Sequence, residues 1–423
     1  MPGVDDSIVG SLCDPARPTF LFGCTPPSEV TSEQEAIDVA RKFADRGRVL
    51  AVDGYIVYDV QDESSRTDAK RPFPYRRLME PSRYARHLAH AAHKECVVYK
   101  AVTSMDSPEH FGAWLSQLMH QGCHTAINIV GAPSSKGASR PTGPSTKEAS
   151  LLTAKLAKGK DGPQLRFGAV CIAERHAQKG VEHVIMGKKM AWGAEWFVTQ
   201  GIYDPEPMIR VLHDYAKLCR EQGVVPKKVV LTFTPCGRRK TLEFIKWLGM
   251  QVPKHVEDAL FPPAPEPEPA PAATSAGAPT KKKKKAKTAV QASCELLCDN
   301  LRRILSETAG CGVPLGINVE SVSGFKDEID ATHDLFRSLQ AILLDATGSP
   351  WVVRWSRLGH LRVRTPVPVP QGDGDHEDAG GRLVTTTSQL QPIGPPRHAW
   401  EQTALLVLTA ASLGAWAAKK KFI

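Results

Sequence analysis

The fold is decided by residues 166–233, which read RFGAVCIAERHAQKGVEHVIMGKKMAWGAEWFVTQGIYDPEPMIRVLHDYAKLCREQGVVPKKVVLTF. The stretch contains three short apolar runs that are continuous rather than alternating, as expected of strands buried on both faces. Two longer amphipathic segments separate these runs. The order of strand and helix predicts a parallel sheet covered by helices. The runs are Arg166–Ile172, Trp196–Gln200 and Lys228–Phe233, and the helical segments are Val181–Trp192 and Pro205–Gln222.

The same pattern extends in both directions from this stretch and brings the number of expected strands to eight. Eight strands that alternate with helices are typical of a (β/α)8 TIM barrel, an α/β fold. Pro81, Pro108 and Pro205 stand at expected helix starts, where the missing N–H does no harm. The other strands are Thr19–Cys24, Val49–Asp53, Val97–Val102, Ala126–Val130 and Pro314–Val319, and the other helices are Ser32–Arg46, Pro81–Lys94, Pro108–Gln121, Thr241–Gly249, Val290–Thr308 and Asp327–Leu344.

A low-complexity stretch interrupts the expected barrel before its last strand. Residues 261–288 are rich in proline and then in lysine, a composition that cannot bury a core. Because barrel patterns continue on both sides, we interpret the stretch as an insertion within one domain. The expected parts are an N-terminal extension (1–17), two barrel segments (18–260 and 289–346) around the insertion (261–288), a basic hairpin (347–365), a linker (366–400) and a candidate membrane anchor (401–423) ending in KKKFI.

The net charge of +9, from 54 Lys+Arg against 45 Asp+Glu, is local. Six lysines within residues 281–287 and three at 419–421 account for the whole excess. The rest of the chain is neutral, which argues against a nucleic-acid partner. The lysine run fits a solvated linker, an anionic-lipid contact or a nuclear-import patch. The ten cysteines lack metal-like spacing, so we expect free thiols and no metal site.

Residues 403–418 (TALLVLTAASLGAWAA) carry no charge and precede three lysines. As a helix they would span about 24 Å, somewhat less than the ~30 Å hydrocarbon core of a bilayer. Two interpretations stay open. A marginal membrane anchor would make a tail-anchored protein that faces the cytosol from the mitochondrial outer membrane or the endoplasmic reticulum. A helix packed on the barrel or on a partner would instead fit a soluble cytoplasmic protein.

The functional site of a (β/α)8 barrel lies at the carboxyl ends of its strands. Polar residues that converge there from several strands could hold a flat, hydrogen-bonding ligand. Each of them could instead cap a helix or satisfy a loop backbone. The residues that this rule selects are Asp53, Tyr99, Lys100, Gly131, Ala132, Glu174, His176, Gln200, Tyr203, Thr234 and Glu320.

Five segments carry a resemblance to a known family: FLFGCTPP (20–27), AERH (173–176), GAEWFVTQGIYD (193–204), LGMQVPKHVEDAL (248–260) and PLGINVES (314–321). Their order and spacing resemble the methylenetetrahydrofolate reductase family over roughly residues 18–346, apart from the insertion. The resemblance implies a flavin-dependent barrel that reduces methylenetetrahydrofolate to methyltetrahydrofolate with a nicotinamide donor.

The resemblance also implies FAD and NAD(P)H as cofactors, a folate as the substrate, and roles for particular residues. Gln200 resembles the glutamine that holds the pterin, while His176 and Lys189 resemble residues that contact the flavin and its phosphates. Position at the strand ends adds Tyr99 and Gly131 to the candidate cofactor contacts, and Asp53 and Tyr203 to the candidate substrate contacts.

Two carboxylates of the family pattern are missing from this chain. The family's first strand ends in Glu and its fourth in Arg-Gly-Asp, whereas Gly23 and Ala132 stand at these positions here. The chain therefore resembles a divergent branch of the family, in which flavin need not be tightly bound. Glu320 and Glu174 are the carboxylates left to supply a proton, and Glu320 is favoured because it follows an apolar strand into the mouth.

Three functions stay open at this point. The first is an oxidoreductase of the methylenetetrahydrofolate reductase type. The second is a catalytically degenerate barrel, retained as a folate- or nucleotide-binding or assembly subunit. The third is a flavin- or nicotinamide-dependent enzyme that acts on another substrate, because a fold does not determine chemistry. The oligomeric state is left undetermined by the sequence.

Overall fold

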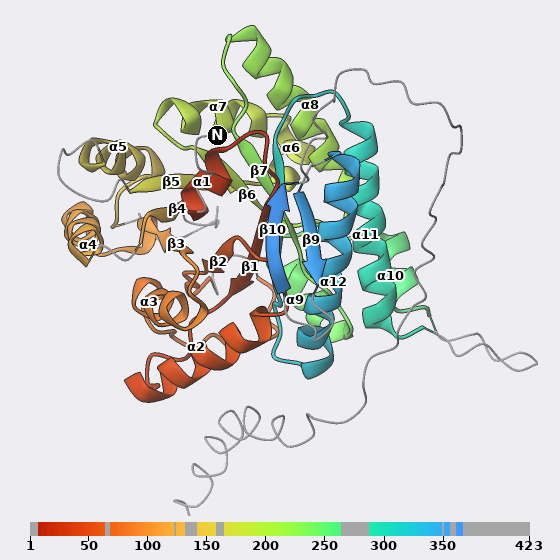
Figure 1. The fold of residues 1–423 in the computed structure, drawn as a ribbon, viewed down its shortest axis with the longest axis horizontal. Helices are drawn as coiled ribbons and strands as arrows, with labels where there is room; N and C mark the ends of the chain where they lie inside the picture. The colour runs from red at the N-terminus through yellow and green to blue at the C-terminus, as the bar shows by residue number, and fades with distance from the viewer. Residues whose placement is uncertain are drawn as a thin grey trace, which may run out of the picture. The chain divides into compact units, whose positions relative to one another are not determined.

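The computed structural model describes residues 7–63, 68–121, 124–131, 142–157, 165–263 and 287–348, and the backbone of 351–355 and 361–366. Eight parallel strands form a closed barrel surrounded by helices (Figure 1), which confirms the predicted (β/α)8 fold. Each strand pairs with the next along the chain, and the last pairs with the first. The strands are β1 Thr19–Cys24, β2 Gly54–Val57, β3 Cys96–Ala101, β4 Ala126–Val130, β5 Arg166–Cys171, β6 Trp196–Gly201, β7 Lys228–Phe233 and β8 Leu315–Val319.

Most of the helices begin at residues suited to that position. Ser32 and Thr288 form capping boxes with Glu35 and Gln291, so that backbone N–H groups of the first turn are satisfied. The helices are α1 Ile8–Cys13, α2 Glu33–Gly47, α3 Pro81–Ala92, α4 Pro108–Gln121, α5 Thr146–Leu156, α6 Ala173–Lys179, α7 Glu182–Ala191, α8 Pro205–Glu221, α9 Arg239–Trp247, α10 Lys254–Leu260, α11 Ala289–Glu307 and α12 Lys326–Ala346, with a short 3-10 turn at Val102–Ser104.

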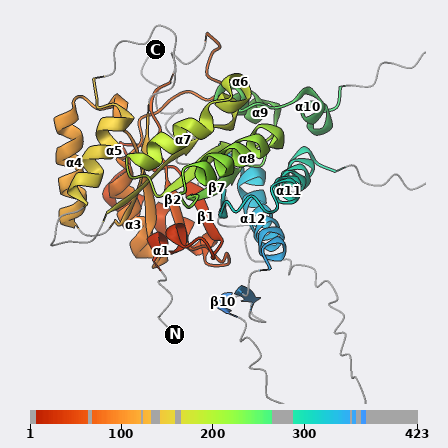
Figure 2. The same cartoon turned by 90° about the horizontal axis from the view of Figure 1, so that it is seen from above.

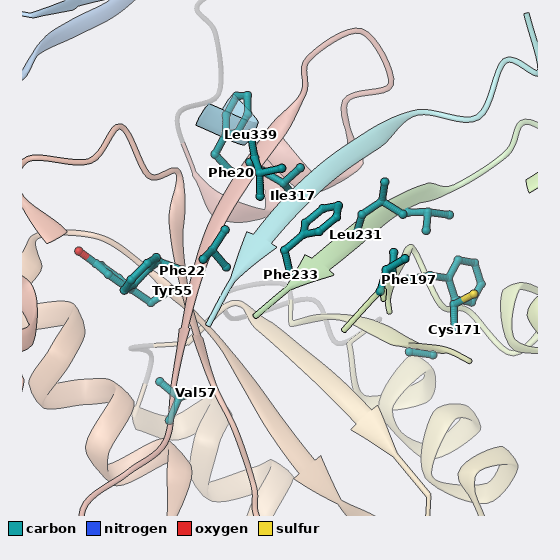
Figure 3. Close-up of a cluster of buried hydrophobic side chains, with 14 of the residues drawn as sticks. Phe20, Phe22, Tyr55, Val57, Cys171, Phe197, Leu231, Phe233, Ile317 and Leu339 are labelled. Carbon is teal, nitrogen blue, oxygen red and sulfur yellow. The ribbon is translucent and has the colours of Figure 1, made fainter. Parts of the chain in front are cut away.

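Alternate strand residues face the helices and the barrel interior. The outward-facing set includes large apolar side chains such as Phe20, Phe197 and Phe233, which form the main core with the helices (Figure 3). The inward-facing set includes Leu21, which lies in a second apolar cluster, and Trp196, which is fully buried there. The strands are therefore buried on both faces, as their continuous apolar runs indicate.

The short helix α1 closes the amino end of the barrel. Its residues Ile8 and Leu12 are buried in the interior cluster. Beneath them Lys228 donates hydrogen bonds to the carbonyl oxygen of Arg17 (2.6 Å) and to Thr19 Oγ1 (2.8 Å). Burial lowers the pKa of Lys228 to about 8, partly offset by Asp53. The described residues at this end are packed against one another.

The second strand lies later in the chain than predicted. The strand is Gly54–Val57, not 49–53, so Asp53 stands at its amino end. The Oδ1 atom of Asp53 lies 2.6 Å from Arg17 Nη2, and its Oδ2 accepts the backbone N–H of Phe20 at 2.8 Å. The prediction that Asp53 belongs to the mouth is therefore wrong. The residues that follow the strand are Tyr58 and Asp59.

Other parts of the predicted organisation lie outside the described residues, namely most of the insertion (264–286) and the apolar segment at 401–423. Within 347–366, β9 (Trp351–Trp355) and β10 (Leu361–Pro366) pair as an antiparallel two-stranded sheet. None of the described helices is long and apolar enough to cross a membrane. Figure 2 shows the helices and the barrel from a second direction.

Candidate functional site

A group of polar side chains from neighbouring strands lies at the barrel mouth. Asn318 of β8 donates its Nδ2–H to Tyr58 Oη, after β2, at 2.9 Å, and lies 3.4 Å from Thr232 Oγ1 of β7. Tyr58 packs edge-on against Tyr99 of β3, with 4.7 Å between ring centroids. Tyr99 thus reaches the mouth as predicted, but packed against another ring.

Glu320 follows β8 directly beside this group. Its backbone N–H donates to the carbonyl of Phe233, which fixes the residue at the end of the barrel ladder. Its Oε2 atom is buried and has no hydrogen-bond partner among the described residues. Burial raises the pKa of Glu320 to about 7, and the polar groups of Tyr58 and Asn318 offset only part of that rise. A carboxyl group with this pKa can give or take a proton near neutral pH.

Gly23 is the residue that makes room for Glu320. A Cβ atom at Gly23 would lie 3.1 Å from Glu320 Oε2 and 2.8 Å from Tyr58 Cε2. The space beside the end of the first strand is therefore filled by a carboxyl group that comes from the eighth strand.

Replacing Gly23 by alanine is expected to displace Tyr58 or Glu320 and to lower the free energy of unfolding by about 1–3 kcal/mol, the usual effect of overpacking. Denaturant unfolding measures this change. The matched control is Gly112→Ala in α4, where the new Cβ would meet Leu152 at 3.7 Å. That change should instead stabilise the protein by up to about 1 kcal/mol. Equal effects of the two changes would contradict the close approach at Gly23.

A cavity of about 380 Å³ adjoins this group on the side of β2 and β3. Tyr58, Asp59, Arg77 and Lys100 line it, so both signs of charge face the space. Asp59 accepts the backbone N–H of Ala101 at 2.8 Å, and burial raises the pKa of its carboxyl group. The cavity is large enough for part of an extended ligand whose other end lies at the barrel axis.

The segment at residues 68–75 packs against α9. It leaves β2, yet Trp247 of α9 donates its indole N–H to the carbonyl of Ala69 at 3.0 Å. Arg71 lies over the rings of Phe244 and Trp247, at 5.4 and 5.0 Å from the centroids. The segment therefore joins the part of the chain that follows β2 to the helix that follows β7.

Gln200 and Glu174 meet the same stretch of chain after α9. Gln200 shares the inward face of β6 with Trp196 and is half-buried, with Nε2 3.5 Å from the carbonyl of Leu248. Glu174 Oε1 lies 3.5 Å from the backbone N of Gln251, and burial raises the pKa of this carboxyl group. The structure thus brings Gln200 and Glu174 to the mouth, next to β5 and β6, while Glu320 enters from β8.

Two predicted cofactor contacts face the helical layer instead. Lys189 is 8% exposed, donates to the carbonyl of Val170 at 2.5 Å and lies 4.0 Å from Glu182. His176 is buried with its Nε2 3.1 Å from Asp214 of α8. Neither side chain is seen directed at the mouth, because Lys189 ties α7 to β5 and His176 ties α6 to α8.

Two further predicted residues play smaller parts. Tyr203 is 1% exposed and donates its hydroxyl to the carbonyl of Thr234 at 2.6 Å, so it stabilises the β6–β7 end beneath α11 rather than reaching a ligand. Gly131 follows β4 and is half-buried, and a Cβ atom at this position would lie 3.0 Å from Thr146 Cγ2. Ala132 lies outside the described residues.

Sequence reasoning missed Tyr58 and two buried asparagines. Asn318 belongs to the mouth group, and Asn128 of β4 is fully buried with neither amide atom hydrogen-bonded among the described residues. Each asparagine interrupts an apolar run, AINIV or LGINV, and that interruption is the signal that could have found them.

Comparison with known proteins adds to this geometry. No family model and no curated protein matches the chain. A solved structure from Clostridium thermocellum, of a protein that binds two copies of 5-methyl-5,6,7,8-tetrahydrofolic acid, is 24% identical over 77% of this chain and 96% of that chain, with a TM-score of 0.59. The oxygenating constituent of 3,6-diketocamphane monooxygenase from Pseudomonas putida is 12% identical over 78% of this chain and 98% of that one, with a TM-score of 0.44. The first similarity shows that the chain shares a known barrel fold.

The described residues do not fit a flavin held as the family resemblance implies. Lys189 is tied to Val170 and Glu182, and His176 is tied to Asp214, so neither presents a free donor to a cofactor at the mouth. No step proposed below therefore uses a flavin.

Proposed function

We propose that the barrel mouth binds a reduced folate and reduces its one-carbon adduct with NAD(P)H. The observation that carries the proposal is Glu320, a buried carboxyl group at the end of β8 whose pKa is raised to about 7. A protein of the same fold that binds 5-methyl-5,6,7,8-tetrahydrofolic acid supports a folate as the ligand. The resemblance of the GAEWFVTQGIYD segment supports the same substrate class.

The reaction needs one proton and one hydride. Protonated Glu320 donates its proton to the folate nitrogen N10, the bond from that nitrogen to the bridging carbon breaks, and an iminium forms at N5. A bound NAD(P)H would supply the hydride, with its two electrons, that reduces the iminium carbon. The products are the methyl-folate and NAD(P)+, and Glu320 regains a proton from solvent. General acids of this kind work best when their pKa lies near the operating pH.

Gln200 is the group best placed to hold the flat ring system, because an amide both donates and accepts hydrogen bonds. Its inward position on β6 lets it meet a ring that enters the mouth. The cavity beside Tyr58 and Lys100 offers space for the remainder of the ligand. Glu174, half-buried beside Gln251, is the second carboxyl group available for proton transfer.

Replacing Gln200 by alanine is expected to weaken folate binding about 10- to 100-fold, the effect of losing one or two hydrogen bonds to a desolvated ligand. Equilibrium titration with methyltetrahydrofolate measures it, and the melting temperature should stay within a degree or two. Gln34→Ala on the exposed face of α2 is the matched control. Unchanged folate affinity in the Gln200 variant would show that Gln200 does not contact the ligand.

One assay tests the function as a whole. The purified chain is mixed with methylenetetrahydrofolate, oxidation of NADH or NADPH is followed, and the visible spectrum is recorded. Turnover by colourless protein supports the proposal. Turnover only with a tightly bound yellow cofactor would contradict the flavin-free step. Folate binding without turnover would overturn the reductase.

The alternative is a catalytically degenerate barrel that binds folate without reducing it. Two observations support it. His176 pairs with Asp214 and Lys189 donates to Val170, so both side chains are held by the protein. Gly23 stands at the end of β1, where the family pattern has a glutamate. Such a protein would bind methyltetrahydrofolate yet oxidise no NAD(P)H in the assay above.

The proposed location is a membrane surface facing the cytosol, reached through residues 401–423, which lie outside the described residues. The apolar segment and its three lysines support it. Chain lacking 401–423 should move from the membrane to the soluble fraction of lysed cells. An unchanged distribution would favour a soluble cytoplasmic protein.

A further inference from the structure

Three side chains from three helices converge on one point of the helical layer. They are His176 of α6, His183 of α7 and Asp214 of α8, and one potential ligand atom from each lies within 4.8 Å of the others. His176 Nε2 is 3.1 Å from Asp214 Oδ2. The two imidazole rings meet edge-on with 5.4 Å between their centroids. Figures 1 and 2 show the three helices side by side.

The two histidines carry polar atoms that the protein does not satisfy. His176 is 5% exposed, and the Nδ1 atoms of both His176 and His183 are buried without a hydrogen-bond partner among the described residues. A buried nitrogen of this kind costs free energy unless something pairs with it. The Nε2 atom of His176 lies beside the Asp214 carboxylate, and one nitrogen of each imidazole lies within 4.8 Å of the other and of a carboxylate oxygen.

The three side chains are of the types that bind divalent cations, because an imidazole nitrogen and a carboxylate oxygen are both common metal ligands. Asp214 supplies the negative charge that offsets part of the charge of a divalent cation.

The cluster is separate from the mouth. Glu174 and His176 are two residues apart on α6, and two residues turn an α-helix by about 200°. Glu174 contacts Gln251 at the mouth, whereas His176 contacts Asp214 on the opposite side of the helix. A ligand at the cluster therefore does not occupy the folate site.

We propose that His176, His183 and Asp214 bind one divalent cation of the zinc class, with water as the fourth ligand. Two imidazoles and one carboxylate suit Zn²⁺, whereas Mg²⁺ and Ca²⁺ prefer all-oxygen sites. The ion links α6, α7 and α8 and so holds the helix that begins directly after β5. Sequence spacing did not indicate a site, because the left-handed turn at Gly180 separates the two histidines onto different helices.

The test is a titration of the untagged, chelator-treated full chain with ZnCl₂ by calorimetry. Expected is one ion per chain, with at least tenfold weaker binding in both His183→Ala and Asp214→Asn and unchanged binding in the control His120→Ala, an exposed histidine of α4. His183 and Asp214 are half-buried, so their variants should fold, and circular dichroism checks this.

Two further readouts separate a built site from surface binding. Zn²⁺ should raise the melting temperature of the wild type and of His120→Ala but not of the two ligand variants, because a ligand that binds only the folded state stabilises it. Mg²⁺ at the same concentration should leave all melting temperatures unchanged. Binding that is equally tight in the ligand variants, or no stoichiometric Zn²⁺ in the wild type, overturns the proposal. The outcome does not depend on folate reduction.

Discussion

The Glu320→Gln variant is expected to lose folate reduction by at least about a hundredfold, the usual contribution of a general acid, while it retains folate binding. Glutamine keeps the shape of the side chain beside Gly23 but cannot donate a proton as an acid. NAD(P)H oxidation measures the rate, and titration with methyltetrahydrofolate measures the binding.

The pH dependence gives the same variant a second readout. Because burial raises the pKa of Glu320 to about 7, the acid form is lost as the pH rises through that value. The wild-type rate should therefore fall above about pH 7, and this fall should vanish from the residual activity of the variant. If Glu320→Gln keeps full activity while Glu174→Gln is inactive, the proton donor is Glu174 and not Glu320.

Glu320 should also make the free energy of unfolding fall as the pH rises. The folded pKa of Glu320 lies above its value in the unfolded chain, so its contribution to stability is complete below about pH 4.5 and is lost as the pH rises through about 7. Glutamine stays neutral and avoids this loss. At pH 8 the variant should thus be more stable than the wild type by about 2 kcal/mol, a figure reduced for partial solvent contact, and at about pH 4 the two should match. Equal stability at both pH values would mean that the carboxyl group is not desolvated.

The barrel could be predicted from the sequence because its strands are continuous apolar runs. The predicted strands β1, β4 and β7 coincide with the observed ones. The second strand was misplaced because apolar residues stand on both sides of Asp53, and burial alone does not distinguish a strand from the buried segment that leads into it. The hydrogen bonds of Asp53 with Arg17 and Phe20 set the start of the second strand. These partners lie 36 and 33 positions before Asp53 in the chain, so a local pattern does not show them.

The site was harder to predict because a position in the chain does not show which way a side chain points. His176 lies two residues after Glu174, yet the α-helix turns them to opposite sides. Lys189 was predicted to contact a flavin, but its side chain donates to Val170 of β5 and lies near Glu182 of its own helix. The relation between Gly23 and Glu320 joins the first and eighth strands, which become neighbours only when the barrel closes.

The Asp53→Ala variant is expected to lose about 3–5 kcal/mol of folding free energy, because it removes one partner of a buried ion pair. Arg17 Nη2 lies 2.6 Å from the carboxylate, and the two side chains are 7% and 5% exposed. The backbone N–H of Phe20 would lose its acceptor as well. The charged Lys228 below α1 would lose an opposite charge that raises its pKa. Denaturant unfolding measures the loss.

The control is Asp38→Ala, whose carboxylate pairs with Arg41 on the exposed face of α2 and should change stability by less than about 0.5 kcal/mol. Below the unfolding transition, the Asp53 variant should bind folate as tightly as the wild type, because the residue lies at the amino end of the barrel. A variant with normal stability and weakened folate binding would contradict this placement and return Asp53 to the mouth. Loss of stability with unchanged folate affinity would show that the two ends of the barrel have different functions. The amino end, with Asp53, Arg17 and Lys228, stabilises the fold, and the carboxyl end binds the ligand.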